Sequence, residues 1–477
     1  MRKILAAVLL LAMVLTICAC GKEKEGNNAG TKNPLDGVFS VGYARENVTP
    51  NYTVSTTLGP STGIMSYIYT TCVVMTDAEG DSVMLFQTDI SAGWAFVMDS
   101  VRGKVSQETG IPVSNIASAG THTHSAPQLL TTDDPAIGKF TTELEAAMLK
   151  CAKDAMADRK EVSQMTTGTI TVPVNTLNFV RHYTTESGHV KGDNFGELVK
   201  SPYTGHTHDA DNVMQIVRFE RKEGKAVSLI NWQTHPHRYY GTGGRDLTAD
   251  LVGAMRDKYE KETGDLFAYY TGASGNINPK SRIEKENTTA DFKEQGEALA
   301  VYAVRCLNEN MTEAPVGKLG VQSKTFAGEV NHSEDGKLEG ASAVYNHWKS
   351  TNNNNSATQM AEQYGIGSPY HAQAIINKSK LGKTLDMELS AFSIGDSVGI
   401  ICAPYEMFDE NGLFVKDHSP FRNTIVITLC NDCVCYISSE AGYEYGSYGA
   451  QTGKFVKGTG ELLASTYVSM LEELYNR

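Results

Sequence analysis

Short apolar runs that suit buried β-strands alternate along this chain with segments of helical periodicity. Residues 82–86 precede a helical pattern over residues 94–109, and residues 266–270 lead into a loop that begins at Gly272. A further amphipathic pattern predicts a surface helix over residues 141–159. This alternation predicts an α/β fold with layered mixed sheets and helices in one large catalytic domain, because helices and sheets must cover one another's apolar faces.

Two histidines, His122 and His124, stand on either side of a single threonine and are flanked by small residues. In an extended segment, side chains two positions apart point to the same face, so the two imidazoles are expected side by side. Such a pair suits a bound cation beside a reacting group. The alternative is a pair of histidines at a strand end or on the surface with no functional role.

Three further candidate side chains follow strand-like runs. His235 comes shortly after the apolar residues 226–230, Glu406 follows residues 398–402, and Tyr436 follows Val434 and Cys435. Strand ends are where α/β proteins place ligands and catalytic groups. These residues are therefore expected to meet in one site although they are far apart in the sequence, which implies one interdependent domain over residues 37–477.

These motifs, taken in order, resemble the neutral, non-lysosomal ceramidases and their bacterial relatives. In that family two histidines, a glutamate and a tyrosine hold a zinc ion, and the resemblance implies that the ligands here are His122, His235, Glu406 and Tyr436. The resemblance covers residues 37–477 and rests on these motifs: Thr121-His122-Thr123-His124-Ser125, the strand end at His235, Thr248-Ala249-Asp250, Gly272-Ala273-Ser274-Gly275-Asn276-Ile277-Asn278-Pro279, Pro404-Tyr405-Glu406 and the tyrosine-rich tail.

The resemblance also implies roles for residues that do not bind the metal. The family's active-site arginine matches Arg181, which ends an Asn-x-x-Arg motif, and two further tyrosines match Tyr445 and Tyr448. His124 would be a second imidazole that hydrogen-bonds the reacting group. The expected reaction is hydrolysis of an amide (N-acyl) bond by metal-activated water, with Arg181 and the phenols facing the developing oxyanion.

Two departures from the family bear on the substrate. The position of a serine in the family's Gly-Asp-x-Ser-Pro motif is occupied by Asn278, and Asn276 stands at the aspartate position, while Ser274 lies four residues before Asn278. The C-terminal immunoglobulin-like domain of the ceramidases has no counterpart before Arg477. A hydrolase of small polar amides or esters is therefore the alternative to an enzyme that acts on lipids.

The first residues resemble a bacterial lipoprotein signal. Arg2 and Lys3 precede an apolar stretch over residues 4–17, and Cys20 occupies the position of a lipidated cysteine. We therefore expect a signal peptide over residues 1–20, a flexible tether over 21–36, and a protein exported and anchored through Cys20 to the outer face of the bacterial cell membrane.

Charge and cysteine content are consistent with an exported enzyme. A net charge of −13 argues against binding to nucleic acid. The cysteines beyond the signal, including Cys430, Cys433 and Cys435, are expected to be mostly buried thiols, although a disulfide remains an alternative in an oxidising compartment.

Two classes of function remain open from the sequence. One is a zinc-dependent amidohydrolase acting on a small-molecule or lipid N-acyl substrate, and the other is a surface lipoprotein that only binds a ligand. Residues 241–244 are expected at the rim of the site, His206 and His208 are expected in structural roles, and Asp89 and Asp250 are candidates for orienting an imidazole N–H or for simple turn roles.

Overall fold

The computed structural model describes residues 35–130, 133–188, 190–192 and 202–477. The expected signal peptide over residues 1–20, with Cys20, lies outside the described residues, as does the expected tether up to residue 34. Within the described residues, no helix is long and apolar enough to cross a membrane.

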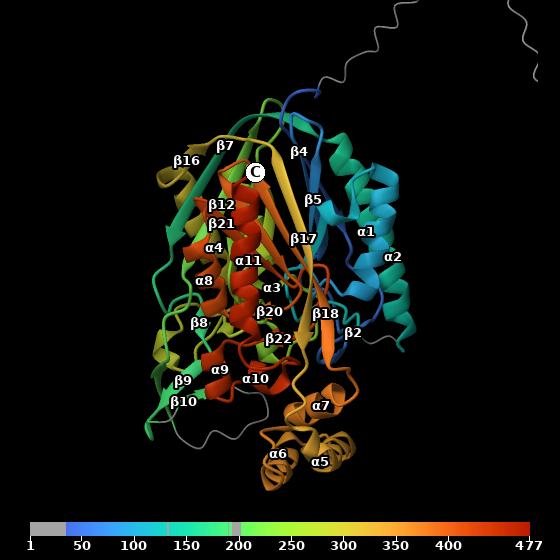
Figure 1. The fold of residues 1–477 in the computed structure, drawn as a ribbon, viewed down its shortest axis with the longest axis vertical. Coiled ribbons are helices and arrows are strands. Elements are labelled where there is room, and N and C mark those ends of the chain that lie inside the picture. The colour runs from blue at the N-terminus through green and yellow to red at the C-terminus, as the bar shows by residue number, and fades with distance from the viewer. Residues whose placement is uncertain (1–34, 131–132, 189, 193–201) are drawn as a thin grey trace, which may run out of the picture.

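A large mixed sheet runs through the centre of the fold (Figure 1). Its strands follow the order β14, β13, β12, β7, β1, β4, β5 and β6, and β16 pairs with β7. The bounds of these strands are β1 Ser40–Asn47, β4 Tyr69–Thr76, β5 Ser82–Thr88, β6 Ile116–Gly120, β7 Lys160–Thr171, β12 Val213–Arg221, β13 Val227–Trp232, β14 Leu266–Thr271 and β16 Thr312–Ala314.

A second sheet packs face to face against the first. It has the order β17, β18, β19 and β21, with bounds Leu319–Glu329, Thr384–Ile394, Val398–Ala403 and Asn423–Thr428. Val41, Leu85 and Leu229 of the large sheet share one apolar cluster with Phe392 and Ile400 of the second sheet. The core between the sheets is apolar because alternate, mostly apolar side chains of both sheets point into it.

Helices cover the outer faces of both sheets. Apolar clusters join α1 and α2 to β4 and β5, α3 and α4 to β12, β13 and β14, and α8 and α11 to the second sheet. The predicted α/β class with layered sheets is confirmed. The bounds of these helices are α1 Ala95–Thr109, α2 Pro135–Ala157, α3 Asp250–Thr263, α4 Phe292–Glu309, α8 Asp409–His418 and α11 Thr459–Tyr475.

Of the two strongest helical patterns in the sequence, one predicts the start of its helix correctly and the other does not. The pattern over residues 94–109 matches α1, whereas α2 begins at Pro135, well before the predicted start at residue 141. Asp134 caps α2 by accepting a hydrogen bond from the Ala136 N–H, and Pro135 occupies the first helical position. A carboxylate cap followed by proline starts a helix whatever the apolar periodicity, which explains the difference.

A small helical unit is inserted between the long strands β17 and β18. It consists of α5 Leu338–Thr351, α6 Asn354–Gln363 and α7 Pro369–Lys378, and it lies at the lower end of the molecule in Figure 1. Val344, Ile366 and Ile375 form its own buried apolar cluster. The unit brings Tyr370 close to the site described below.

Three pairs of long strands are parallel: β5 with β6, β13 with β14, and β19 with β21. The segments that follow β6, β13 and β19 carry His122, His235 and Glu406, and these three side chains meet where the two sheets pack together.

Short elements complete the fold, and two pairs of them, β8 with β15 and β20 with β22, lie in the site. Their bounds are β2 Ser55–Thr56, β3 Gly59–Pro60, β8 Phe179–Val180, β9 His182–Thr185, β10 Val190–Gly192, β11 Tyr203–His206, β15 Ile277–Asn278, β20 Glu406–Met407, β22 Tyr436–Ile437, α9 Glu440–Glu444 and α10 Tyr448–Thr452, with 3₁₀ turns at Val113–Asn115, Tyr240–Thr242, Glu284–Glu286 and Asp335–Lys337.

The described cysteines are free thiols, and only Cys435 is not fully buried. Burial raises the pKa of the Cys433 thiol well above its ordinary value. The expectation of mostly buried free thiols is thus confirmed within the described part of the chain.

Candidate metal centre

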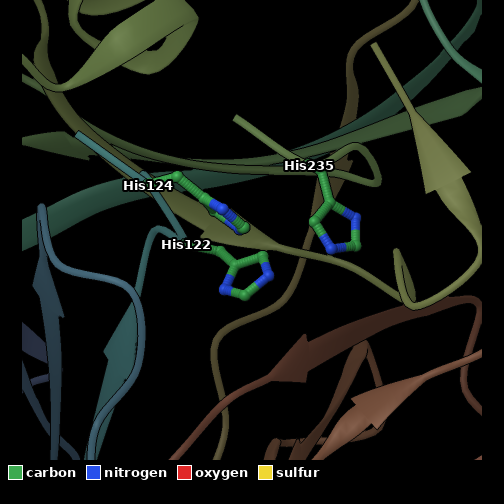
Figure 2. Close-up of side chains that lie close together, drawn as sticks. All are labelled: His122, His124 and His235. Carbon is green, nitrogen blue, oxygen red and sulfur yellow. The ribbon is translucent and has the colours of Figure 1, made fainter. Parts of the chain in front are cut away.

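Three imidazoles converge where the loops after β6 and β13 meet (Figure 2). The ring centroid of His122 lies 4.5 Å from that of His235 and 4.9 Å from that of His124. A ring nitrogen of each of the three lies within 4.8 Å of the others, so together they could hold a metal ion. The predicted meeting of His122 and His235 across the chain is confirmed.

The backbone at His122 differs from the expected extended segment. β6 ends at Gly120, and His122 adopts a left-handed conformation with φ of 72°. A residue with a side chain loses roughly 1–2 kcal/mol in this region. The proximity of His122 and His124 therefore comes from a strained loop and not from strand alternation. The loop is held at Thr121 and His122, whose N–H groups donate to the carbonyls of Thr88 and Ile90.

Backbone carbonyls orient the two histidines that were predicted as ligands. Nδ1 of His122 lies 2.6 Å from the Ser91 carbonyl oxygen, and Nδ1 of His235 lies 2.9 Å from that of Ile277. A carbonyl only accepts, so Nδ1 of each ring carries the proton and Nε2 presents a lone pair. Asp89 and Asp250 do not orient these rings, because Asp89 pairs with Arg256 and Asp250 accepts from the Tyr239 N–H.

Both lone pairs face the carboxylate of Glu406. Oε2 of Glu406 lies 3.3 Å from Nε2 of His122 and 3.1 Å from Nε2 of His235. Burial lowers the pKa of His235 to about 4, so this ring is neutral near pH 7. The pKa of Glu406 lies well below its ordinary value although burial alone would raise it, so the group is a carboxylate. Lone pairs of neutral nitrogen and ionised oxygen repel each other unless a cation lies between them.

Tyr436 stands directly beside Glu406. The two residues are register partners in the short parallel pair β20 and β22, and the Glu406 N–H donates to the Cys435 carbonyl. Tyr436 therefore begins a strand, which differs from the prediction that it follows one. Burial and the Glu406 carboxylate raise the pKa of the phenol well above 10, while Arg181 opposes this shift. Imidazole nitrogen and carboxylate oxygen are donors that fit zinc, and Tyr436 stays a predicted ligand.

Arg181 is buried against the phenols. Its guanidinium carbon lies 5.2 Å from the ring centroid of Tyr436 and 5.5 Å from that of Tyr448. Nη2 donates a 2.5 Å hydrogen bond to the Gly275 carbonyl, and pairing of β8 with β15 holds the backbone. A cation so fixed beside Glu406 and Tyr436 can stabilise an oxyanion.

His124 is half-buried, and both of its ring nitrogens are buried and unused. Among the described residues, neither Nδ1 nor Nε2 of His124 has a hydrogen-bond partner. Burial and the neighbouring histidines keep the pKa of His124 well below its usual value. Its ring lies 5.3 Å from His237 and 5.1 Å from Tyr240, between centroids. The ring is thus neutral and available either to a metal ion or to a reacting group.

Asn278 lies next to the histidines and contacts one of them. Its Oδ1 is 3.3 Å from Nε2 of His237, and it belongs to β15. Asn276, at the position of the family's aspartate, donates to Glu410 at 2.9 Å and to Asp409. Ser274 is buried, and its carbonyl accepts from the Ile277 N–H.

Two ceramidase structures are similar to this chain. The neutral ceramidase of Pseudomonas aeruginosa aligns with a TM-score of 0.68 at 15% identity, covering 93% of this chain and 75% of that one. The chain has the neutral ceramidase fold. A structure described as a ceramidase complexed with C2 aligns with a TM-score of 0.65 at 13% identity, over 93% of this chain and 76% of that one. No family model and no curated protein sequence matches the chain.

Some residues at this site were not predicted as functional. His237 and Tyr240 pack against His124, and Tyr370 of α7 lies 6.3 Å from Tyr448 between ring centroids. His237 follows His235 by two residues, so the repeated His-x-His spacing was a usable signal. No sequence pattern marked Tyr370 as part of the site, because only the fold of the inserted helices brings it near Tyr448.

His206 and His208 lie on the flank of the site. His206 contacts the Val180 carbonyl and Glu286, in agreement with a structural role. His208 lies 3.2 Å from Asp409, and with Glu410 these groups form a second set that could hold a cation. Burial and the Asp409 carboxylate raise the pKa of Glu410 to about 8.

The Tyr445 ring contacts the ring of His182, the residue that follows Arg181. Their ring centroids are 5.5 Å apart, so the structure places Tyr445 beside His182. Nδ1 of His182 has no hydrogen-bond partner among the described residues, and burial together with Arg181 lowers the pKa of His182 to about 3.

His182 should make the folded protein sensitive to acid. Its pKa is about 3 in the folded state, and an unfolded histidine has a pKa of about 6.5. The unfolded state therefore binds more protons between these values, and stability is complete above pH 6.5 and falls as the pH decreases to 3. At pH 5 the loss is about 2 kcal/mol from this group. Urea unfolding of His182→Phe at pH 7.5 and pH 5 should show a pH effect smaller by that amount.

His418, exposed at the end of α8, provides the control for this measurement. His418→Phe should retain the pH effect of the unsubstituted protein. An unchanged pH effect in His182→Phe would mean that His182 is protonated or solvated in the folded state.

Proposed function

We propose that this protein is a zinc-dependent amidohydrolase that cleaves an N-acyl bond. The convergence of Nε2 of His122 and Nε2 of His235 on the Glu406 carboxylate carries the proposal, since this arrangement needs a cation. The neutral ceramidase fold supports the same function. The residues proposed to hold zinc are His122, His235, Glu406 and Tyr436. When bound there, zinc supplies a Lewis acid for the acyl carbonyl and lowers the pKa of water toward neutrality.

The surrounding residues each have a proposed role. Arg181, buried and always charged, lies where it can stabilise negative charge that develops on the acyl oxygen. The Tyr448 ring packs on the Arg181 guanidinium. Tyr445 does not act on Arg181 directly; its proposed role is to hold His182, the next residue in the chain, through a ring contact. These groups are already positioned, so little reorganisation is needed when charge develops.

His124 is the proposed proton carrier. Burial keeps its imidazole neutral, so it can accept a proton at one ring nitrogen and pass it to the leaving nitrogen of the amide. Asn278 cannot form an acyl-enzyme, because a carboxamide is a poor nucleophile. Its proposed role is to orient the substrate, with Oδ1 held near His237.

A direct assay tests the proposal. The purified protein is assayed with N-acyl lipids, N-acyl amino acids and simple esters, before and after treatment with a chelator and after addition of zinc. We expect release of a fatty acid from an N-acyl compound, loss of that activity on chelation and its return with zinc. Stoichiometric zinc without turnover of any substrate would favour a ligand-binding protein, and activity that survives complete zinc removal would exclude the metal.

We also propose that the protein is exported and anchored to the outer face of the cell membrane through a lipid on Cys20. The charged start, the apolar stretch and the position of Cys20 support this. Cys20→Ser should move the protein from the membrane fraction to the soluble fraction of the cells that export it. Continued presence in the membrane fraction would contradict the anchor.

A further inference from the structure

A cavity of about 590 Å³ opens beside the histidines. His237 and Asn278, which contact each other, form part of its wall, and so does Tyr240, which packs on His124. Gly241 also lines it, as expected for the rim. The volume is within the range of cavities that bind small molecules, roughly 300–1,000 Å³. A substrate at the metal centre therefore has room to extend past His124 into this cavity.

The wall of the cavity is cationic although the protein as a whole is acidic. Arg238, Lys280 and Arg282 line it, against a single carboxylate, Asp291. The net charge of the chain is −13, so this local excess does not follow from composition. Cations around a partly enclosed cavity favour an anionic ligand.

Arg238 is the most informative of these residues because it is nine-tenths buried, with 9% of its surface exposed. Nη2 donates to the Thr289 carbonyl at 2.7 Å, whereas Nη1 has no hydrogen-bond partner among the described residues. A buried guanidinium with an unused donor is costly, and the negative charge of a carboxylate or phosphate in the cavity that Arg238 lines offsets that cost.

The carboxylates nearest Arg238 are already engaged by backbone groups. Asp291 caps α4 by accepting from the N–H groups of Lys293 and Glu294, and Glu294 accepts from the Ala290 N–H. Asp250 accepts from the N–H groups of Tyr239 and Leu251. These groups reduce the positive potential at Arg238 without pairing with its Nη1.

We propose that this cavity is a subsite for an anionic group on the amine side of the substrate, so that the preferred substrates are N-acyl amino acids or other N-acyl amines that carry an anion close to the scissile nitrogen. The side follows from the position of His124, which is proposed to protonate the leaving nitrogen and whose neighbour Tyr240 lines the cavity. The inference rests on the proposed hydrolase function and adds a substrate class to it.

A pair of matched substrates tests the subsite. N-lauroylglycine and N-lauroylethanolamine have the same acyl chain and the same amide. N-lauroylglycine carries a carboxylate at the position where N-lauroylethanolamine carries a hydroxymethyl group. We expect kcat/KM to be at least about tenfold higher for N-lauroylglycine, because hydrogen bonds between charged groups are stronger than those between neutral groups. The preference should fall as salt concentration rises. N-lauroyl phosphoethanolamine, assayed in parallel, distinguishes a phosphate from a carboxylate as the preferred anion.

Charge-altering variants locate the effect. Lys280→Glu and Arg282→Gln should each lower kcat/KM for N-lauroylglycine about tenfold, because KM rises while kcat stays the same. The value of kcat/KM for N-lauroylethanolamine should not change in either variant. Lys225→Glu is the matched control, since Lys225 is exposed before β13, at the end of the strand opposite His235. Equal kcat/KM for the charged and neutral compounds, or equal effects of Lys280→Glu and Lys225→Glu, would overturn the subsite.

A binding measurement separates this inference from the proposed hydrolysis. Calorimetric titration of the full chain with N-lauroylglycine in the presence of a chelator should show binding that Lys280→Glu weakens about tenfold. Such binding without any turnover in the zinc-loaded protein would support the subsite and reject the hydrolase. Hydrolysis of N-lauroylethanolamine, without measurable binding of N-lauroylglycine, would support the hydrolase and reject the subsite.

Discussion

Replacement of His122 and His235 together by alanine should remove the bound metal and lower the rate of amide hydrolysis by at least about a thousandfold. Both Nε2 atoms face the Glu406 carboxylate, so the double variant leaves only Glu406, Tyr436 and the neighbouring His124 near the metal position. A metal Lewis acid is worth several kcal/mol, and each 1.36 kcal/mol is a factor of about ten in rate. Elemental analysis should find about one zinc ion per unsubstituted chain and almost none per variant chain.

A double variant at histidines outside the site is the control for this loss. His332→Ala with His418→Ala also removes two histidines, but from outside the site, and should leave the zinc content and the rate unchanged. Zinc retained undiminished by the His122→Ala and His235→Ala chain, or no stoichiometric zinc in the unsubstituted protein, would refute the ligand assignment.

Replacement of His124 by alanine should lower the rate of hydrolysis by roughly a hundredfold or more, whereas Ser274→Ala should retain most of it. Loss of a general acid or base usually costs about 10²–10⁴-fold. Zinc content decides the role of His124, because its ring nitrogen also lies within 4.8 Å of those of His122 and His235. Full zinc content in His124→Ala indicates a proton carrier, and zinc loss in that variant indicates a third imidazole ligand.

Ser274 is the matched comparison because it lies in the same loop as Asn278, is buried, and has a hydroxyl that could act as a nucleophile. Loss of turnover in Ser274→Ala with fold and zinc intact, or an acyl group trapped on Ser274 and detected by mass spectrometry, would reject attack by water in favour of a serine nucleophile.

The histidine motifs and strand ends are enough to predict much of the site from the amino-acid sequence. The resemblance assigns His122, His235, Glu406 and Tyr436, and the fold brings His122 and His235 together with Glu406 and sets Tyr436 opposite Glu406 in register. A single parallel edge does not explain this meeting, because β6 and β13 run in opposite directions along the large sheet and β19 belongs to the second sheet. The packing of the two sheets brings these strand ends together.

Local conformation is predicted less well than position. The periodicity of residues 121–124 suggests an extended segment, but His122 is left-handed in a loop held by Thr88 and Ile90. Hydrogen bonds to strands from another part of the sheet impose that conformation, and a pattern of side chains does not contain them. The predicted start of α2 is wrong for a similar reason, because a cap at Asp134 outweighs the apolar periodicity.

By itself the sequence determined the α/β class, the chemical types of the proposed ligands and the loops that carry them, because periodicity and residue type act locally. Only the tertiary structure decided which lone pairs face Glu406, that Arg181 stacks on Tyr436, and that the cations Arg238, Lys280 and Arg282 surround one cavity. These side-chain contacts depend on backbone carbonyls, on the packing of the sheets and on segments far apart in the chain. The segments come within contact distance of one another only when the two sheets close on their shared core.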